Sequence, residues 1–86
     1  MDVMAINTVS LSSLSPGDIG TVMGLHGVRG AARQRLLEMG LMQGVRIRFV
    51  RRAPLGDPIE ILLSGYHLML RNSEAIGISV HIENGV

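Results

Sequence analysis

The chain has 86 residues, 47% of them hydrophobic, and Phe49 and Tyr66 are its only aromatic residues. This length allows one domain with an aliphatic core, which buries roughly 60 to 65% of the unfolded surface. All eight basic residues are arginine and the net charge is only +1, which disfavours a nucleic-acid binder, while the lack of cysteine excludes disulfides and thiolate metal sites.

The first ten residues lack the periodicity of a helix or a strand. We therefore expect residues 1–10 to form a flexible N-terminal extension, although Val9 and Leu11 could begin a packed arm, and residues 11–86 to form a single domain. The first basic residue is Arg29, so the N-terminus lacks the charged start of a signal peptide. No charge-free apolar stretch reaches about 18 residues. These features predict a cytoplasmic protein without direct membrane insertion.

The first regular element follows a turn at Ser15-Pro16-Gly17-Asp18. Apolar and small residues alternate over residues 19–25, which predicts a strand, and its glycines allow the strong curvature that a small barrel needs.

A short helix is predicted next. Gly30 and Ala31 open it, and Ala32, Leu36 and Met39 recur at the helical spacing that places side chains on a core-facing side. Gly40 follows in the position of a left-handed C-terminal glycine.

The chain then alternates with a period of two in four segments. Residues 45–52 and 59–63 predict a hairpin across Ala53-Pro54-Leu55-Gly56-Asp57-Pro58, and residues 66–71 and 76–82 predict two further strands after the turns at residues 64–65 and 72–75. Four arginines, at positions 46, 48, 51 and 52, would point outward as one basic stripe, which we interpret as a solvated face.

Several spaced motifs resemble one family. The stretches RLLEMGL and APLGDP, and then Leu68, Leu70, Arg71, Ser73, Glu74 and Ala75, are similar in order and spacing to the small ferrous-iron transport accessory protein FeoA. The similarity runs from about Leu11 to about Val80. It implies a mainly β fold, a small SH3-like β-barrel of about five strands with one short α-helix between the first two strands. It also implies a cytoplasmic partner of the FeoB membrane transporter, which carries a cytosolic GTPase domain. The ten-residue leader departs from the family pattern.

Enzymatic chemistry is disfavoured by the residue types. Cysteine is absent, Ser64 lacks the glycine frame of a nucleophile elbow, and Asp57 and Glu60 are interpreted as solvated acids. Gly24, Gly27 and Gly30 match neither phosphate-binding fingerprint. We therefore expect no catalytic activity and no required cofactor.

A metal site is expected to be weak at most. A stable first-row metal site needs three or four converging ligands, and the histidines are spread along the chain. The candidates for a weak surface or interchain divalent-metal site, which could bridge a homodimer, are His26, His67, His81 and Glu83. Ordinary exposed histidines are the favoured interpretation.

A docking surface has more support from the residue types. If one side of the helix faces the barrel, Leu37 lies roughly 100 to 140° away from it and is left for another chain. Methionines and leucines beside arginines suit a protein interface. The predicted partner-binding residues are Leu25, Arg33, Arg35, Leu37, Met39, Leu41, Met42 and Leu55. The alternative is that Leu41 and Leu55 plug the ends of the barrel.

Two other functions stay open from the sequence. SH3-like barrels of this kind also resemble the C-terminal domains of metal-dependent repressors, so the chain could be a stand-alone regulatory module. An RNA-binding barrel would use the strand arginines, but it would also need aromatic stacking residues and a larger basic excess.

Overall fold

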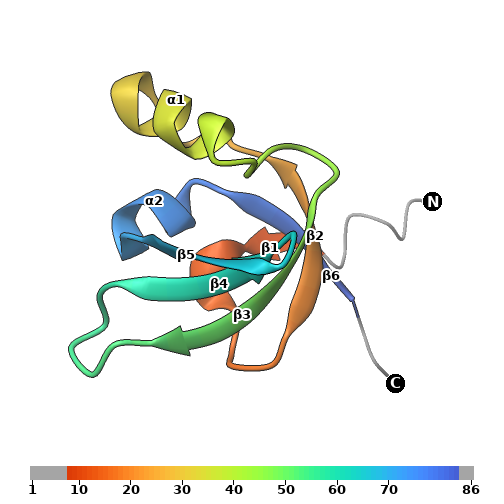
Figure 1. Ribbon diagram of the computed structural model, residues 1–86, viewed down its shortest axis with the longest axis vertical. Coiled ribbons are helices and arrows are strands. Elements are labelled where there is room, and N and C mark those ends of the chain that lie inside the picture. Colours follow the sequence, from red (N-terminus) through yellow and green to blue (C-terminus); the bar gives the residue numbers. More distant parts are fainter. Residues whose placement is uncertain (1–7, 84–86) are drawn as a thin grey trace.

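The structure, a computed structural model, describes residues 8–83 and forms one six-stranded antiparallel sheet (Figure 1). The elements in chain order are β1 (Thr8–Ser10), a 3₁₀ turn (Leu11–Ser13), β2 (Ile19–Gly24), α1 (Gly30–Glu38), β3 (Arg46–Arg52), β4 (Ile59–Leu63), β5 (Tyr66–Leu70), α2 (Asn72–Ile76) and β6 (Ser79–Glu83). The strand order is β1-β6-β2-β3-β4-β5. The sheet curls around the core, α1 lies above β5 and α2, and the β3–β4 turn projects away from α1.

The predicted fold class is confirmed, with one strand more than expected. The five predicted strands correspond to β2 to β6, and the helix lies between the first two of them. The additional strand β1 pairs with β6 from Thr8 to Ser10. The end of the predicted flexible extension is therefore ordered, because the strand continues directly into the buried Leu11. Residues 1–7 of that extension lie outside the described residues.

The core is aliphatic apart from one ring. Phe49 is fully buried, and the residues around it come from the inward positions of the strands, from α1 and from the turns. The buried set is Leu11, Leu14, Val22, Leu25, Val28, Leu36, Leu41, Ile47, Phe49, Ile59, Ile61, Leu63, Leu68, Leu70, Ala75, Ile78 and Val80. No polar or charged residue is buried among residues 8–83.

The C-terminus of α1 ends as its sequence predicts. Gly40 has φ +94°, and the N–H groups of Gly40 and Leu41 donate to the carbonyl oxygens of Leu37 and Leu36 at 3.0 Å each. This is a Schellman motif, and it directs Leu41 back into the core.

A β-bulge in β3 overturns part of the predicted arginine stripe. The register with β4 shifts between Phe49 and Arg51, so Val50 is an extra residue. Arg51 stays on the outer face opposite Glu60, but Arg52 pairs with the buried Ile59, and its guanidinium donates to the Ser12 carbonyl and to Asn72 Oδ1. Arg52 is therefore half-buried and does not continue the solvated row.

Candidate docking surface

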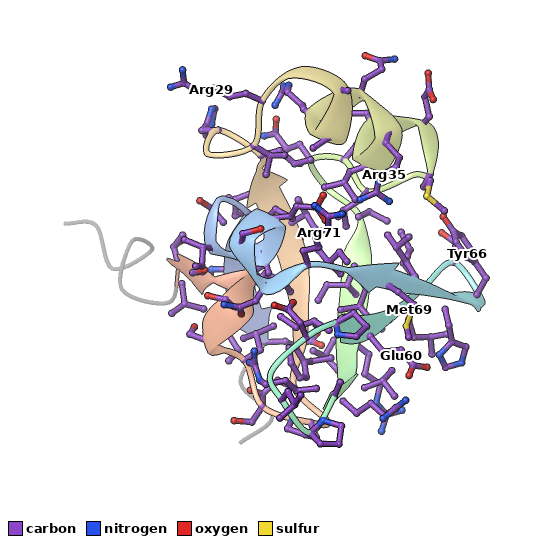
Figure 2. The ribbon with its side chains drawn as sticks, turned by 90° about the vertical axis from the view of Figure 1, so that its left-hand side faces the viewer. Arg29, Arg35, Glu60, Tyr66, Met69 and Arg71 are labelled. Atoms are coloured by element: carbon purple, nitrogen blue, oxygen red, sulfur yellow. The ribbon has the colours of Figure 1, made fainter. Side chains whose placement is uncertain are left out.

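A cleft lies between α1 and β5, which we call the α1–β5 cleft. Its volume is about 450 Å³. Ala31, Ala32 and Arg35 line it from the helix, and Met69 to Arg71 line it from the end of β5. Figure 2 shows α1 above β5 on this face, with Arg35 reaching down from the helix and Met69 on the strand.

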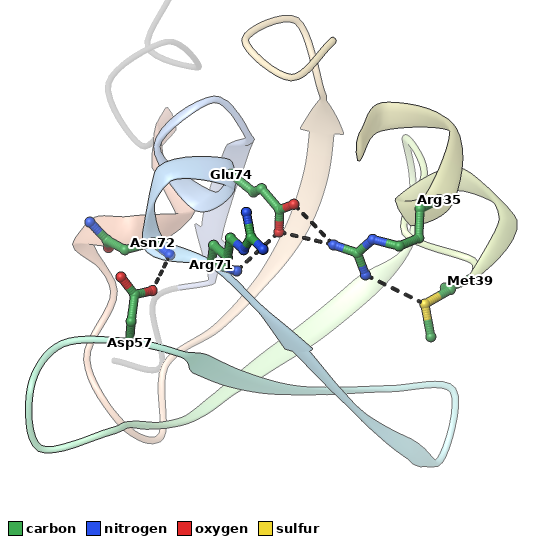
Figure 3. Close-up of polar contacts among 6 residues, drawn as sticks. All are labelled: Arg35, Met39, Asp57, Arg71, Asn72 and Glu74. Carbon is green, nitrogen blue, oxygen red and sulfur yellow. Dashed lines mark hydrogen bonds and ion pairs between the residues drawn. The ribbon is translucent and has the colours of Figure 1, made fainter. Parts of the chain in front are cut away.

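An ion pair crosses the cleft at the α2 end. The Arg35 guanidinium donates to both carboxylate oxygens of Glu74, at 3.1 Å and 3.0 Å. The same Glu74 carboxylate accepts the backbone N–H of Arg71 at 3.0 Å, at the start of α2 (Figure 3). Glu74 therefore stabilises the N-terminus of α2 and at the same time fastens α1 to α2.

The β3–β4 turn contributes to the same helix. The Asp57 carboxylate accepts the backbone N–H of Asn72, the first residue of α2 (Figure 3). Asp57 is thus more than the solvated turn residue that the sequence suggests, because a carboxylate satisfies an N–H group that a helix leaves without an internal partner.

Tyr66 lies beside the C-terminus of α1. A Cβ added to Gly40 would lie 3.5 Å from the Tyr66 hydroxyl, so the tyrosine side chain reaches from the start of β5 to the C-terminus of α1. Figure 2 shows Tyr66 at this end of β5, remote from Arg71. Both contacts lie in the C-terminal part of α1, because Arg35 belongs to its last turn, and the cleft lies between α1 and the strand.

The predicted partner-binding residues divide into exposed and buried groups. Leu55 is 97% exposed at the tip of the β3–β4 turn, and Met39 and Met42 are exposed after the helix. Leu25 and Leu41 are only 3% and 0% exposed, so their prediction as surface residues is wrong. The alternative, that these leucines fill the ends of the barrel, agrees with the burial of Leu41 but not with the exposure of Leu55.

The helix differs from its predicted orientation in two residues. Leu36 is fully buried as expected, but Leu37 is half-buried and packs against the core, and Met39 is exposed. The reason is that α1 ends at Glu38, so Met39 no longer follows the helical wheel. Arg33 and Arg35 are exposed at the surface, and an Nη of Arg33 donates to the Leu25 carbonyl at 3.0 Å.

Other exposed apolar residues were not singled out from the sequence. Tyr66 and Met69 on β5 are both partly exposed, and Met69 lines the cleft. The alternation of β5 does predict an outward Met69, but it cannot show that α1 lies across from it.

Two of the four candidates for the weak metal site, His67 and Glu83, contact other side chains. His67 Nδ1 is 2.7 Å from Glu60 Oε2, and the second oxygen of Glu60 accepts from Arg51 Nε at 2.9 Å. Glu83, the predicted companion of His81, is instead paired with Arg46 at 2.7 Å. Within residues 8–83 no group of three acidic, histidine or cysteine side chains is placed to hold a metal ion. The weak metal site at His26, His67, His81 or Glu83 stays a prediction.

None of the helices in residues 8–83 has the length and hydrophobicity needed to cross a membrane.

Comparisons with known proteins agree with this geometry. The model of the FeoA domain matches residues 9–82. A fusion of Fe(2+) transport protein A with the Fe(2+) transporter FeoB, from Porphyromonas gingivalis, is 39% identical over 72 residues, which are 84% of this chain. The chain spans only 8% of the length of that relative.

Solved structures resemble the fold closely. The solution structure of the FeoA protein from Chlorobium tepidum is 42% identical, with a TM-score of 0.84, over 91% of this chain and 73% of that chain. The zinc complex of Stenotrophomonas maltophilia FeoA, described as a prokaryotic SH3 domain protein, is 26% identical, with a TM-score of 0.75, over 91% of this chain and 99% of that chain.

A manganese-dependent transcriptional repressor shares the fold alone. It is 22% identical, with a TM-score of 0.80, over 88% of this chain and 37% of that chain. The match of the FeoA domain model to nearly the whole chain, together with the SH3-like barrel, settles the family. This protein belongs to the FeoA family.

Proposed function

We propose that the chain is a non-catalytic, cytoplasmic accessory protein of bacterial ferrous-iron uptake. It binds the cytosolic portion of a FeoB-type transporter and modulates the transporter's GTPase activity or assembly. The observation that carries this proposal is the Porphyromonas gingivalis relative, whose name joins an Fe(2+) transport protein A to FeoB in one chain. Two activities fused in one chain in one organism commonly act together when they are separate.

The surface supports a docking role more than a catalytic one. The polar groups on the outer face satisfy one another, as Glu60 does with Arg51 and His67. Leu55, Met39 and Met42 expose apolar side chains, and an Nη of Arg35 lies 3.9 Å from the Met39 sulfur. Apolar anchors surrounded by charged residues are typical of protein interfaces, where the charges orient the encounter.

The test is an NMR titration of the labelled protein with the isolated cytosolic portion of its cognate FeoB-type transporter, with and without guanine nucleotide. We expect localised shifts around the C-terminus of α1 and the β3–β4 turn. Leu55→Glu and Met42→Glu should each weaken binding about tenfold, because a buried anchor is replaced by a charge.

Met23→Glu is the matched control, since Met23 is exposed on β2 and is not among the proposed anchors. If Leu55→Glu and Met42→Glu bind as well as this control, the docking residues are wrong. If the wild-type chain shows no shift in any nucleotide state, docking to the cytosolic portion is wrong.

A stand-alone regulatory module is the second candidate. The likeness to the manganese-dependent repressor favours it, but that likeness extends to the fold alone. The same titration separates the two functions, because a regulatory module has no reason to bind the transporter.

A further inference from the structure

β5 has a free edge. It is the last strand of the sheet and pairs with β4 alone among residues 8–83. The two strands meet at a two-residue turn, Ser64-Gly65, with positive φ at both residues, so the closing pair Leu63 and Tyr66 is hydrogen-bonded.

The register decides which backbone groups of β5 are unused. In an antiparallel pair, hydrogen-bonded and non-hydrogen-bonded residues alternate. Tyr66, Leu68 and Leu70 therefore direct their N–H and C=O groups to β4, and His67 and Met69 direct theirs away from it. No turn or loop backbone of residues 8–83 bonds to His67 or Met69. The backbones of His67 and Met69 thus offer two N–H donors and two C=O acceptors, spaced as a neighbouring strand would need them.

The α1–β5 cleft gives an added segment room beside this edge. Met69 borders the cleft, and the helix opposite presents Ala31 and Ala32, whose side chains are single methyl groups. Proteins usually cover or block an exposed strand edge, because unpaired backbone groups invite another strand. Here the helix lies across from the edge without pairing with it (Figure 2).

The charges around the cleft indicate the kind of segment. Arg35 is neutralised by Glu74, but the exposed guanidinium of Arg71 has no polar partner among residues 8–83. The apolar part of the lining comes from Ala31 and Ala32 of the helix and from Met69 and Leu70 of the strand. A carboxylate beside Arg71 and an apolar side chain beside Met69 would therefore complement this surface.

We propose that the partner contributes an extended segment that adds to the free edge of β5 as a further strand. Its backbone pairs with His67 and Met69, an apolar side chain enters the α1–β5 cleft, and an acidic side chain meets Arg71. The identity of the partner, a FeoB-type transporter, rests on the function proposed above. Strand addition of this kind takes affinity from main-chain hydrogen bonds and specificity from alternate side-chain pockets.

The test compares Met69→Pro with Met69→Ala in binding to the cytosolic portion of the transporter. Both variants remove the Met69 side chain, but only proline removes the backbone N–H that points away from β4. Proline is tolerated on an edge strand when its missing N–H faces solvent, so the ladder to β4 should survive. We expect Met69→Pro to bind about tenfold more weakly than Met69→Ala, since one main-chain hydrogen bond is lost and the ring obstructs pairing.

Hydrogen exchange provides the second measurement. The amides of His67 and Met69 should exchange rapidly in the free wild-type protein and at least about tenfold more slowly in the complex. The amides of Leu68 and Leu70 should be protected in both states and in Met69→Pro, which shows that the strand is intact.

Each other outcome overturns the inference in a recognisable way. If the transporter binds but His67 and Met69 stay unprotected and the two variants bind alike, strand addition is wrong and the proposed function stands. If both amides become protected at high concentration of the chain alone, a second copy occupies the edge instead. If the wild-type chain does not bind at all, the proposed function fails and this inference fails with it.

Discussion

Gly27 and Gly77 are the two residues whose identity the packing constrains most directly. The N–H of Gly27 donates to the Gly77 carbonyl at 2.9 Å. A Cβ on Gly27 would lie 2.5 Å from Gly77 Cα, and a Cβ on Gly77 would lie 2.4 Å from the Gly27 carbonyl carbon. Neither residue has positive φ, so the requirement is for space between two backbones. This contact fixes the β2–α1 loop to the end of α2.

Gly77→Ala should lower the free energy of unfolding by about 1 to 3 kcal/mol, because backbone atoms must move to admit one methyl group. Urea denaturation followed by circular dichroism measures the change. Gly24→Ala is the control, since its Cβ would meet the imidazole of His26 at 2.8 Å, and this exposed ring can swing aside. Equal losses for the two variants would show that the Gly27–Gly77 approach does not limit the substitution.

The sequence indicates that a glycine is required only when the reason lies in the neighbouring residues. Gly40 was predicted as a left-handed glycine because the end of a helical pattern lies beside it. Gly27 lies just before the predicted helix, but its contact with Gly77 depends on two segments that meet only in the folded chain. No local pattern carries that information.

At the scale of elements, α1 depends on how it is fastened to the barrel. Leu36 anchors its inner side in the core, and Arg35 binds Glu74 of α2 at its surface. The Arg35 side chain is 46% exposed, so water weakens the ion pair, whereas Glu74 is 11% exposed and also accepts the Arg71 N–H. Glu74 therefore contributes more than Arg35 to the stability of the folded protein.

Glu74→Ala should cost about 1 to 2 kcal/mol of unfolding free energy, since it removes both the ion pair and the acceptor at the start of α2. Arg35→Ala should cost less than about 1 kcal/mol, because it removes a half-exposed ion pair alone. Thermal denaturation of the single variants and of the double variant completes the cycle. An Arg35→Ala loss as large as that of Glu74→Ala would mean that the ion pair, and not the helix start, dominates.

The elements themselves were largely predictable. The alternation of apolar residues in five segments predicts β2 to β6, and the helical spacing in one segment predicts α1, all in the observed order. β1 was missed because three residues are too few to show a period, and its existence depends on pairing with β6. The bulge at Val50 was missed because alternation assumes an unbroken register. The cleft could not be foreseen, since it forms between a helix and a strand that are not consecutive.

At the scale of the whole molecule, Arg52 joins parts of the chain that the sheet alone leaves apart. One Nη donates to the Ser12 carbonyl at 2.7 Å, the other donates to Asn72 Oδ1 at 3.1 Å, and the guanidinium lies 5.2 Å from the centre of the Phe49 ring. The 3₁₀ turn, α2 and β3 are thus held at one point. The bulge makes this possible, because an unbroken strand would aim residue 52 at solvent.

Arg52→Ala should therefore destabilise the protein by about 1.5 to 3 kcal/mol, the range for hydrogen bonds to a charged group. Arg52→Lys should recover only part of this loss, because a single ammonium cannot reproduce the fork that reaches both acceptors. For a domain of this size, about 1 kcal/mol corresponds to roughly 4 to 8 °C in Tm, so calorimetry resolves the series. Arg48→Ala, on the exposed outer face of the same strand, should change the stability by less than about 0.5 kcal/mol. If Arg52→Ala were no worse than Arg48→Ala, the barrel would be closed by its apolar core alone, and the inward turn of Arg52 would be a consequence of the bulge without a role in stability.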